Sequence, residues 1–205
     1  IAPIPDLLIQ PVVAAALVEE GRLRFDSTLG EVFPELAGTM DPGFSKVTLQ
    51  QLLSHTSGLP SDDEAFGELL GKAALREENL DDVRRWILQE RAPVPLEAKA
   101  GTRFAYSNLG YTLAGAMLER AGGKTWEALV VERVFTPLGL SSAGFGPASS
   151  PGRVDAPLGH LDVGGKRQAF LAGPGAANPA VIGPAGTVHL SVLDFARWAG
   201  WNAGE

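Results

Sequence analysis

Cysteine is absent from the 205 residues of the sequence. Disulfide bonds, a thiolate nucleophile and a cysteine-ligated metal are therefore excluded. Cytosolic and periplasmic proteins both tolerate this absence, so it leaves the compartment open. No apolar run approaches the roughly 20 residues that a membrane-spanning helix needs, and we expect no membrane span. The sequence shows no signal peptide, but it begins with Ile1 rather than Met, and we expect that an upstream piece is missing.

Positive charge is scarce as well. The 17 Lys and Arg residues stand against 24 Asp and Glu residues, which gives a net charge of -7. Phosphate backbones require clustered cations, and the sequence has no basic run, so we expect no nucleic-acid partner. The histidines His160 and His189 lack the spacing of metal ligands, and we expect neither a metal nor a cofactor. With 45% hydrophobic residues, the composition is typical of a globular domain that buries a core.

Apolar periodicity and capping residues predict a mainly helical chain. An apolar body of small residues predicts a helix over residues 5–20, closed by Gly21. Thr48 and Gln51 form a capping box before a helix that we expect to end at Gly58. We expect five more helices, at 28–33, from 79 onward, at 109–121, at 126–135 and from 191 onward. The small residues within 109–121 predict close backbone packing against a neighbouring element.

Two segments lack this helical order. Residues 61–78 are acidic and weakly periodic, and we expect a surface excursion in which Asp62, Asp63 and Glu64 form a solvated loop. Residues 141–187 are rich in Gly, Pro and Ala, with short strand-like pieces such as 169–171. An irregular region of this length is usually functional or poorly ordered.

Three stretches carry a resemblance to a known family. The first is residues 47–60, with the run Leu-Leu-Ser-His-Thr-Ser-Gly-Leu-Pro. The second is residues 101–111 around Tyr-Ser-Asn, continuing to Pro-Leu-Gly-Leu at 137–140. The third is Pro-Ala-Gly-Thr at 184–187, followed by a Ser-x-x-Asp-x-Ala-x-Trp pattern. In order and spacing they resemble the class C-like members of the serine β-lactamase, DD-peptidase and esterase superfamily.

The resemblance implies an α+β fold of the serine β-lactamase/DD-peptidase type. Residues 17–23 match the end of the family's nucleophile-bearing helix, and the family's central sheet comes from strands before that helix and after residue 205. We therefore expect residues 1–205 to form a single β-lactamase-related domain that is incomplete at both ends, mostly the helical lobe with few short strands. The implied chemistry is hydrolysis of a small-molecule or peptide-like acyl substrate (a β-lactam, a peptide or an ester) through an acyl-serine.

The Tyr-x-Asn element of the family is matched residue by residue by Tyr106 and Asn108. The resemblance makes Tyr106 the candidate catalytic residue, with Asn108, Ser107 and Gly186 as candidate substrate-binding residues. A phenol with an ordinary pKa of about 10 acts as a base only where cations lower that pKa. Two simpler interpretations stay open: Tyr106 is a plain loop aromatic, and Asn108 caps the helix that follows it.

The family's nucleophile motif is missing, because no Ser-x-x-Lys occurs anywhere in the 205 residues. Counting back from Gly21 places the serine and lysine positions at Ile4 and Leu7, and a local match places them at Pro3 and Asp6. None of these side chains can act as the serine or the lysine of that pair. The Lys-Thr-Gly or His-x-Gly strand that the family carries near its C-terminus is also absent.

Three hypotheses follow from this departure. The chain belongs to an enzyme whose nucleophile lies outside it or has been lost; it is a non-catalytic relative that serves as a binding or regulatory module; or it is a truncated product. A catalytic triad built on His55 with Ser54 or Ser57 is rejected, because no Gly-x-Ser-x-Gly elbow surrounds either serine. We expect the 55–58 segment to close a helix and tie a turn through side-chain hydrogen bonds.

Overall fold

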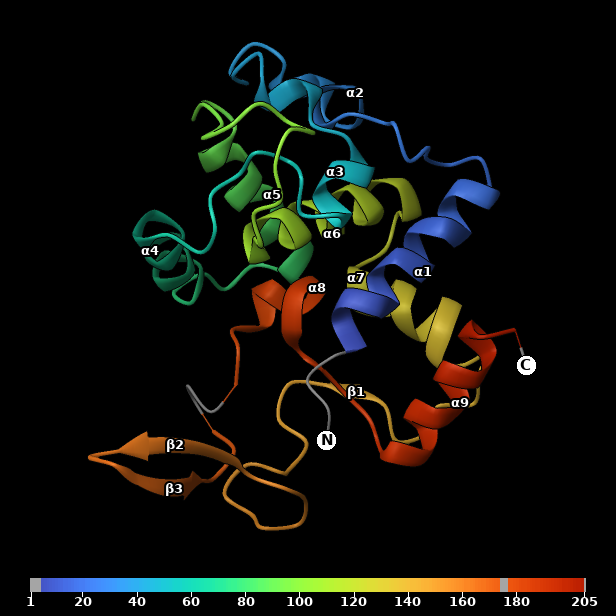
Figure 1. Ribbon diagram of the computed structural model, residues 1–205, viewed down its shortest axis with the longest axis vertical. Coiled ribbons are helices and arrows are strands. Elements are labelled where there is room, and N and C mark those ends of the chain that lie inside the picture. The colour runs from blue at the N-terminus through green and yellow to red at the C-terminus, as the bar shows by residue number, and fades with distance from the viewer. Residues whose placement is uncertain (1–4, 174–176, 205) are drawn as a thin grey trace.

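The computed structural model describes residues 5–173 and 177–204, and most of this part of the chain is helical (Figure 1). The α-helices are α1 (Pro5–Glu19), α2 (Leu29–Val32), α3 (Leu49–Leu53), α4 (Glu64–Ala73), α5 (Leu80–Arg91), α6 (Asn108–Gly122), α7 (Trp126–Val130), α8 (Gly183–Gly186) and α9 (Val192–Asn202). Short 3-10 helices occupy Pro34–Leu36, Phe44–Lys46 and Ala180–Ile182. A short π-helix at Val131–Phe135 continues α7. The strands are β1 (Gly144–Phe145), β2 (Gly159–Val163), β3 (Lys166–Phe170) and β4 (Val188–His189).

Helix α6 is the centre of the core, and most of its residues are buried. Helices α1, α2, α3, α5, α7 and α8 all pack against it. At Gly115 a β-carbon would lie 2.4 Å from Cγ of Pro184, so only glycine allows α8 to come this close. The close packing predicted from the small residues of this helix is confirmed, and α8 is one of the neighbours involved.

Local signals set several helix boundaries as the sequence predicted. Thr28 with Glu31, and Thr48 with Gln51, each form a reciprocal capping box. Helix α3 nevertheless ends at Leu53, earlier than expected, because the chain turns at His55 with a φ of 55°. A second turn at Gly58, with a φ of 78°, leaves no room for a side chain, since a β-carbon would lie 2.1 Å from the Ala98 carbonyl oxygen.

The segment 61–78 lies largely at the surface, as the sequence predicted, but it contains α4, a helix that the sequence did not predict. The carboxylate of Asp63 accepts the Phe66 N–H at 2.7 Å and caps the helix. Phe66, Leu69 and Ala73 repeat at helical spacing on one buried face. The acidic residues between these three masked the period, since a short helix carries only a few apolar positions.

Strands are few and short, which confirms the predicted α+β class. Strands β1 and β4 pair antiparallel, as do β2 and β3. The β2–β3 hairpin projects from the helical body (Figure 1), and its strand residues are exposed except for a half-buried Phe170. Gly164 and Gly165 form its turn with positive φ values of 59° and 77°, as a tight hairpin turn requires. No helix in the described ranges has the length and apolar character needed to cross a membrane.

A buried ion-pair network joins the helices to the segment that leads into α8. Arg84 of α5 is fully buried and donates to the carboxylates of Glu119 and Glu127. It also donates to the carbonyl oxygens of Val181 at 2.8 Å and Ala180 at 3.1 Å. Burial by itself lowers the pKa of Arg84, but the two carboxylates outweigh it and the pKa is raised, so the guanidinium stays charged.

Candidate functional site

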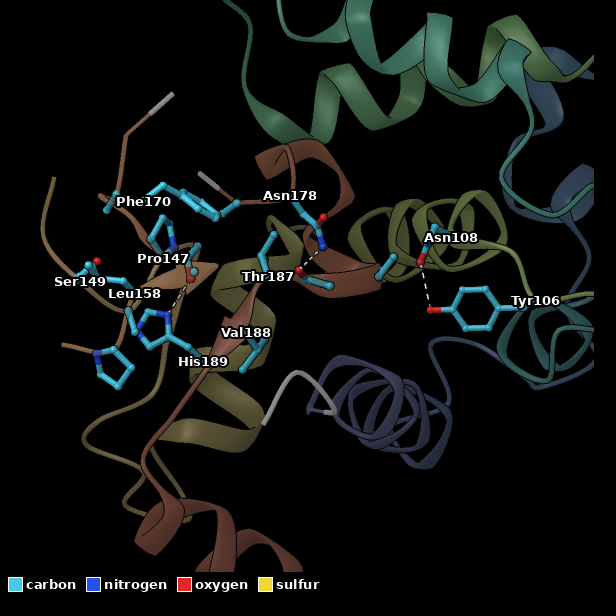
Figure 2. Close-up of a pocket in the computed structure, with 18 residues that line it drawn as sticks. Tyr106, Asn108, Pro147, Ser149, Leu158, Phe170, Asn178, Thr187, Val188 and His189 are labelled. Carbon is cyan, nitrogen blue, oxygen red and sulfur yellow. Dashed lines mark hydrogen bonds between the residues drawn. The ribbon is translucent and has the colours of Figure 1, made fainter. Parts of the chain in front are cut away.

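Tyr106 and Asn108 lie at the junction between an extended segment and α6. Ser107 is the N-cap of the helix, and its hydroxyl accepts the Gly110 N–H at 3.2 Å. The Tyr106 hydroxyl donates to Oδ1 of Asn108 at 3.2 Å, as Figure 2 shows. Tyr106 is 40% exposed, and its hydroxyl has a defined partner in Asn108. The cap is Ser107 and not Asn108, which leaves the Asn108 amide available for other contacts.

Asp62 holds the Asn108 side of this pair. Its Oδ1 accepts the backbone N–H of Asn108 at 3.1 Å, and its Oδ2 accepts the side-chain N–H of Asn108. Asp62 is exposed in the loop before α4, as the sequence predicted, but the sequence did not predict its hydrogen bonds to Asn108. The contact escaped the sequence because 46 residues separate the two partners, and no local pattern connects them.

His55 supports the same junction from the other side. Its Nδ1 accepts the backbone N–H of Ser107 at 3.2 Å, so the ring is neutral with its proton on Nε2. The ring stacks on Tyr111 with centroids 4.8 Å apart and lies 4.5 Å from the ring of Tyr106. Burial lowers the pKa of His55, against the opposing effect of the Asp62 carboxylate.

Side-chain hydrogen bonds tie the turn around His55, as the sequence predicted. The hydroxyls of Ser54 and Thr56 lie 2.8 Å apart, and the Ser57 hydroxyl accepts the Leu59 N–H at 3.3 Å. The aromatic neighbours of His55 could not be foreseen, since they come from the extended segment and from α6. The geometry gives His55 the role of a scaffold for the junction.

A pocket of about 540 Å³ opens beside Tyr106 and Asn108 (Figure 2). Gly186, another of the candidate substrate-binding residues, lines the same space, and its carbonyl oxygen accepts from Nδ2 of Asn178 at 2.8 Å. A β-carbon at Gly186 would lie 2.8 Å from that same nitrogen, so a side chain would push Asn178 away. Tyr106, Asn108 and Gly186 thus meet at one cavity, while Ser107 is buried and its hydroxyl is engaged in the cap. A role of Ser107 at the substrate stays a prediction.

Other polar residues of the pocket were not singled out from the sequence. Asn178, Thr187 and His189 all line it, and Nδ1 of His189 lies 3.0 Å from the carbonyl oxygen of Gly146. The pairing of β1 with β4 brings His189 to this wall. Two-residue strands carry no readable alternation, so the sequence offered no signal for that pairing.

The electrostatics of the pocket bear directly on Tyr106. No Lys, Arg, Asp or Glu is among the described side chains that line the cavity, those of residues 9–173 and 177–204, and the described residues hold no cluster of acidic residues and histidines that would bind a metal ion. Pro3 and Ile4 lie outside the described residues, as do the side chains of Asp6 and Leu7.

Helix α1, which the resemblance identifies with the nucleophile-bearing helix, runs beside the pocket wall. It packs against α6, α8 and β4, and the last two carry Gly186 and His189. Gln10 of α1 is fully buried and donates to the carbonyl oxygen of Tyr111 at 3.0 Å. The helix is thereby fixed next to the element that carries Asn108.

Comparison with known proteins bears on these features. A family model described as Beta-lactamase matches residues 10–205. Over 196 residues the chain is 29% identical to a lovastatin esterase of Penicillium rubens, covering 89% of this chain and 46% of the esterase. Over 183 residues it is 30% identical to penicillin-binding protein 4 of Amycolatopsis lactamdurans, covering 89% and 45%. The chain thus spans about half the length of these two curated relatives.

Solved structures show the same relationship in three dimensions. A penicillin-binding protein from Bacillus halodurans superimposes with a TM-score of 0.68 at 28% identity, covering 96% of this chain and 56% of that protein. FmtA from Staphylococcus aureus gives a TM-score of 0.72 at 16% identity, covering 97% and 50%, which supports the fold alone.

Proposed function

Because the chain belongs to the beta-lactamase family, we propose that it supplies the Tyr-x-Asn side of a serine-hydrolase site that acts on an ester, a peptide or a β-lactam. The observation that carries the proposal is the Tyr106–Asn108 hydrogen bond at the edge of a pocket that Gly186 also lines. These are the residues that the family resemblance identifies with the catalytic and substrate-binding positions. The names of the relatives, an esterase and penicillin-binding proteins, support acyl transfer as the reaction class.

In the proposed reaction, Tyr106 transfers a proton from the serine hydroxyl to the leaving group of the substrate. When a serine oxygen bonds to the substrate carbonyl carbon, its proton passes to the phenolate of Tyr106, and the phenol then protonates the leaving group. Water hydrolyses the resulting acyl-serine. The phenolate forms near neutral pH only beside a cation. A complete site therefore requires a nucleophilic serine and a cation, and the 205 residues contain no Ser-x-x-Lys that would supply them.

The pocket wall favours a substrate with both amide-binding and apolar parts. The amides of Asn108 and Asn178 supply hydrogen-bonding groups, while Leu158, Phe170 and Val188 supply apolar surface. Ligand sites commonly combine an apolar lining with a few fixed polar groups. An acyl group with a polar carbonyl end and an apolar body fits this combination.

One observation favours a second function, ligand binding without turnover. The sequence lacks Ser-x-x-Lys, and the positions matched to that pair carry Pro3 or Ile4 and Asp6 or Leu7. A pocket that keeps Tyr106 and Asn108 would then bind an acylated ligand and release it unchanged. The two functions differ in one property, the formation of product.

Turnover of a chromogenic ester by the full-length protein tests the proposal. We expect Tyr106→Phe to lower kcat by about 10²-fold or more, because the variant keeps the ring and loses only the group that transfers the proton. Tyr111→Phe is the matched control. Tyr111 is buried in α6, and its hydroxyl donates to the Leu53 carbonyl oxygen. Equal activities of the two variants would overturn the role of Tyr106, and an inactive wild-type protein that still binds the ester would favour the second function.

A further inference from the structure

The carboxylate of Asp62 lies between the N-termini of α4 and α6 and accepts two hydrogen bonds from one residue, Asn108. We infer that Asp62 is a positioning residue, which holds the Asn108 amide in a single orientation and thereby directs the amide oxygen at the Tyr106 hydroxyl. The inference rests on the proposed function, since the orientation matters only if Tyr106 transfers a proton.

The two hydrogen bonds fix the helix end and the amide together. The backbone N–H of Asn108 belongs to the first turn of α6, where N–H groups have no partner within the helix. A negative charge at a helix N-terminus is favourable as well. Asp62 is therefore held by α6 itself, and its second oxygen remains in a fixed place beside the Asn108 side chain.

Only one orientation of the amide satisfies this arrangement. The amide nitrogen donates to Asp62 and the amide oxygen accepts from Tyr106. Rotation of the amide by half a turn would set its oxygen against the carboxylate, so the hydrogen bond to Asp62 would be lost, and the phenol would have to accept from the amide nitrogen instead of donating to the amide oxygen. The carboxylate thus determines which atom of Asn108 the phenol meets.

The negative charge of Asp62 is linked to the phenol of Tyr106 through two hydrogen bonds, one from Asn108 to Asp62 and one from Tyr106 to Asn108. That charge opposes ionisation of Tyr106, and the amide oxygen stabilises the protonated phenol by accepting its hydrogen. Among the described residues, the ionisable neighbours include His55, whose neutral ring lies against Tyr106, and Tyr111 on α6. His189 lines the same pocket, and the adjacent Asp63 is engaged in capping α4.

The experiment is a titration of tyrosinate absorbance in this chain. The sequence has two tyrosines, and burial raises the pKa of Tyr111 to about 12, so Tyr106→Phe identifies which part of the titration belongs to Tyr106. We expect Asp62→Asn to move the Tyr106 midpoint down by about half a pH unit, the effect of one unit charge at this range in a solvent-accessible site.

Asp63→Asn is the matched control, because it removes the same charge one residue away and retains a side chain that caps α4. We expect it to leave the Tyr106 midpoint in place. Side-chain amide resonances of Asn108 give a second readout near neutral pH, and we expect them to shift in Asp62→Asn alone. An unchanged midpoint in Asp62→Asn, or equal shifts in both variants, would overturn the positioning role.

The outcome for Asp62 is separable from the outcome for the proposed function. An unshifted titration would refute the role of Asp62 and leave acyl transfer standing. Absence of ester turnover in the full-length protein would refute acyl transfer and leave the titration result intact. In an active full-length protein, we expect Asp62→Asn to lower kcat more than it raises KM, because losing the fixed orientation of the proton-transferring group outweighs the easier ionisation of Tyr106 that loss of the charge brings.

Discussion

His55 shows how one side chain makes the site depend on pH. Its Nδ1 accepts the Ser107 N–H, which only a neutral ring can do, and burial lowers its pKa. The unfolded chain takes up the proton near the ordinary value of about 6.5, so it binds more protons than the folded chain below that pH. The stabilisation is complete above about 6.5 and is lost as the pH falls through the folded-state pKa.

The first prediction therefore concerns His55→Asn. Asparagine tolerates the positive φ of this position and carries an oxygen that can accept the Ser107 N–H. We expect the wild-type chain to lose free energy of unfolding between pH 7 and pH 5, and His55→Asn to lose less over the same range. Urea denaturation at the two pH values measures both losses. Equal losses in the two proteins would show that His55 does not carry this pH dependence.

At the scale of elements, Arg84 links α5, α6 and α7 to the turn that precedes α8. Removing one partner from a buried ion pair leaves an uncompensated charge or unpaired polar groups in the core. We expect Arg84→Ala to lower the free energy of unfolding by about 3–5 kcal/mol. The carbonyl groups of Ala180 and Val181 would lose their donor, so we also expect faster hydrogen exchange across α8.

A surface pair supplies the control for this prediction. Arg24 lies 2.9 Å from Asp26, and both side chains are largely exposed. We expect Arg24→Ala to change the free energy of unfolding by less than about 1 kcal/mol, because solvent screens such pairs. Comparable losses in Arg24→Ala and Arg84→Ala, measured by urea denaturation, would contradict the assignment of Arg84 as a buried link.

The sequence predicted those elements whose signals are local. The capping box of Thr48 and Gln51 spans three residues, and both hydrogen bonds formed as expected. Helix α4 was missed because its buried face has only three residues, set among acidic ones. The Arg84 network was missed because its partners are 35 and 43 residues away, a separation that only the folded chain removes.

At the scale of the whole molecule, the site combines a motif with long-range contacts. Tyr106, Asn108 and Gly186 were identified by resemblance alone, and they line one pocket, although their roles in binding and catalysis stay predictions. Asp62 and His55 were not identified as neighbours of that motif, since each acts on residues 46 or 52 positions away. Family membership was predictable because it depends on short patterns along the chain. The contacts that Asp62 and His55 make with the motif were not, because they form only when the chain packs.

The central claim is that the Tyr106–Asn108 pair belongs to an acyl-transfer site, and the intact mass of the full-length protein after incubation with a penicillin or a fluorophosphonate tests it most directly. We predict one covalent adduct per chain, formed about 10²-fold more slowly in Tyr106→Phe and at the wild-type rate in Tyr111→Phe. A full-length protein that gains no mass with either reagent, or that gains it equally fast without the Tyr106 hydroxyl, would contradict the claim.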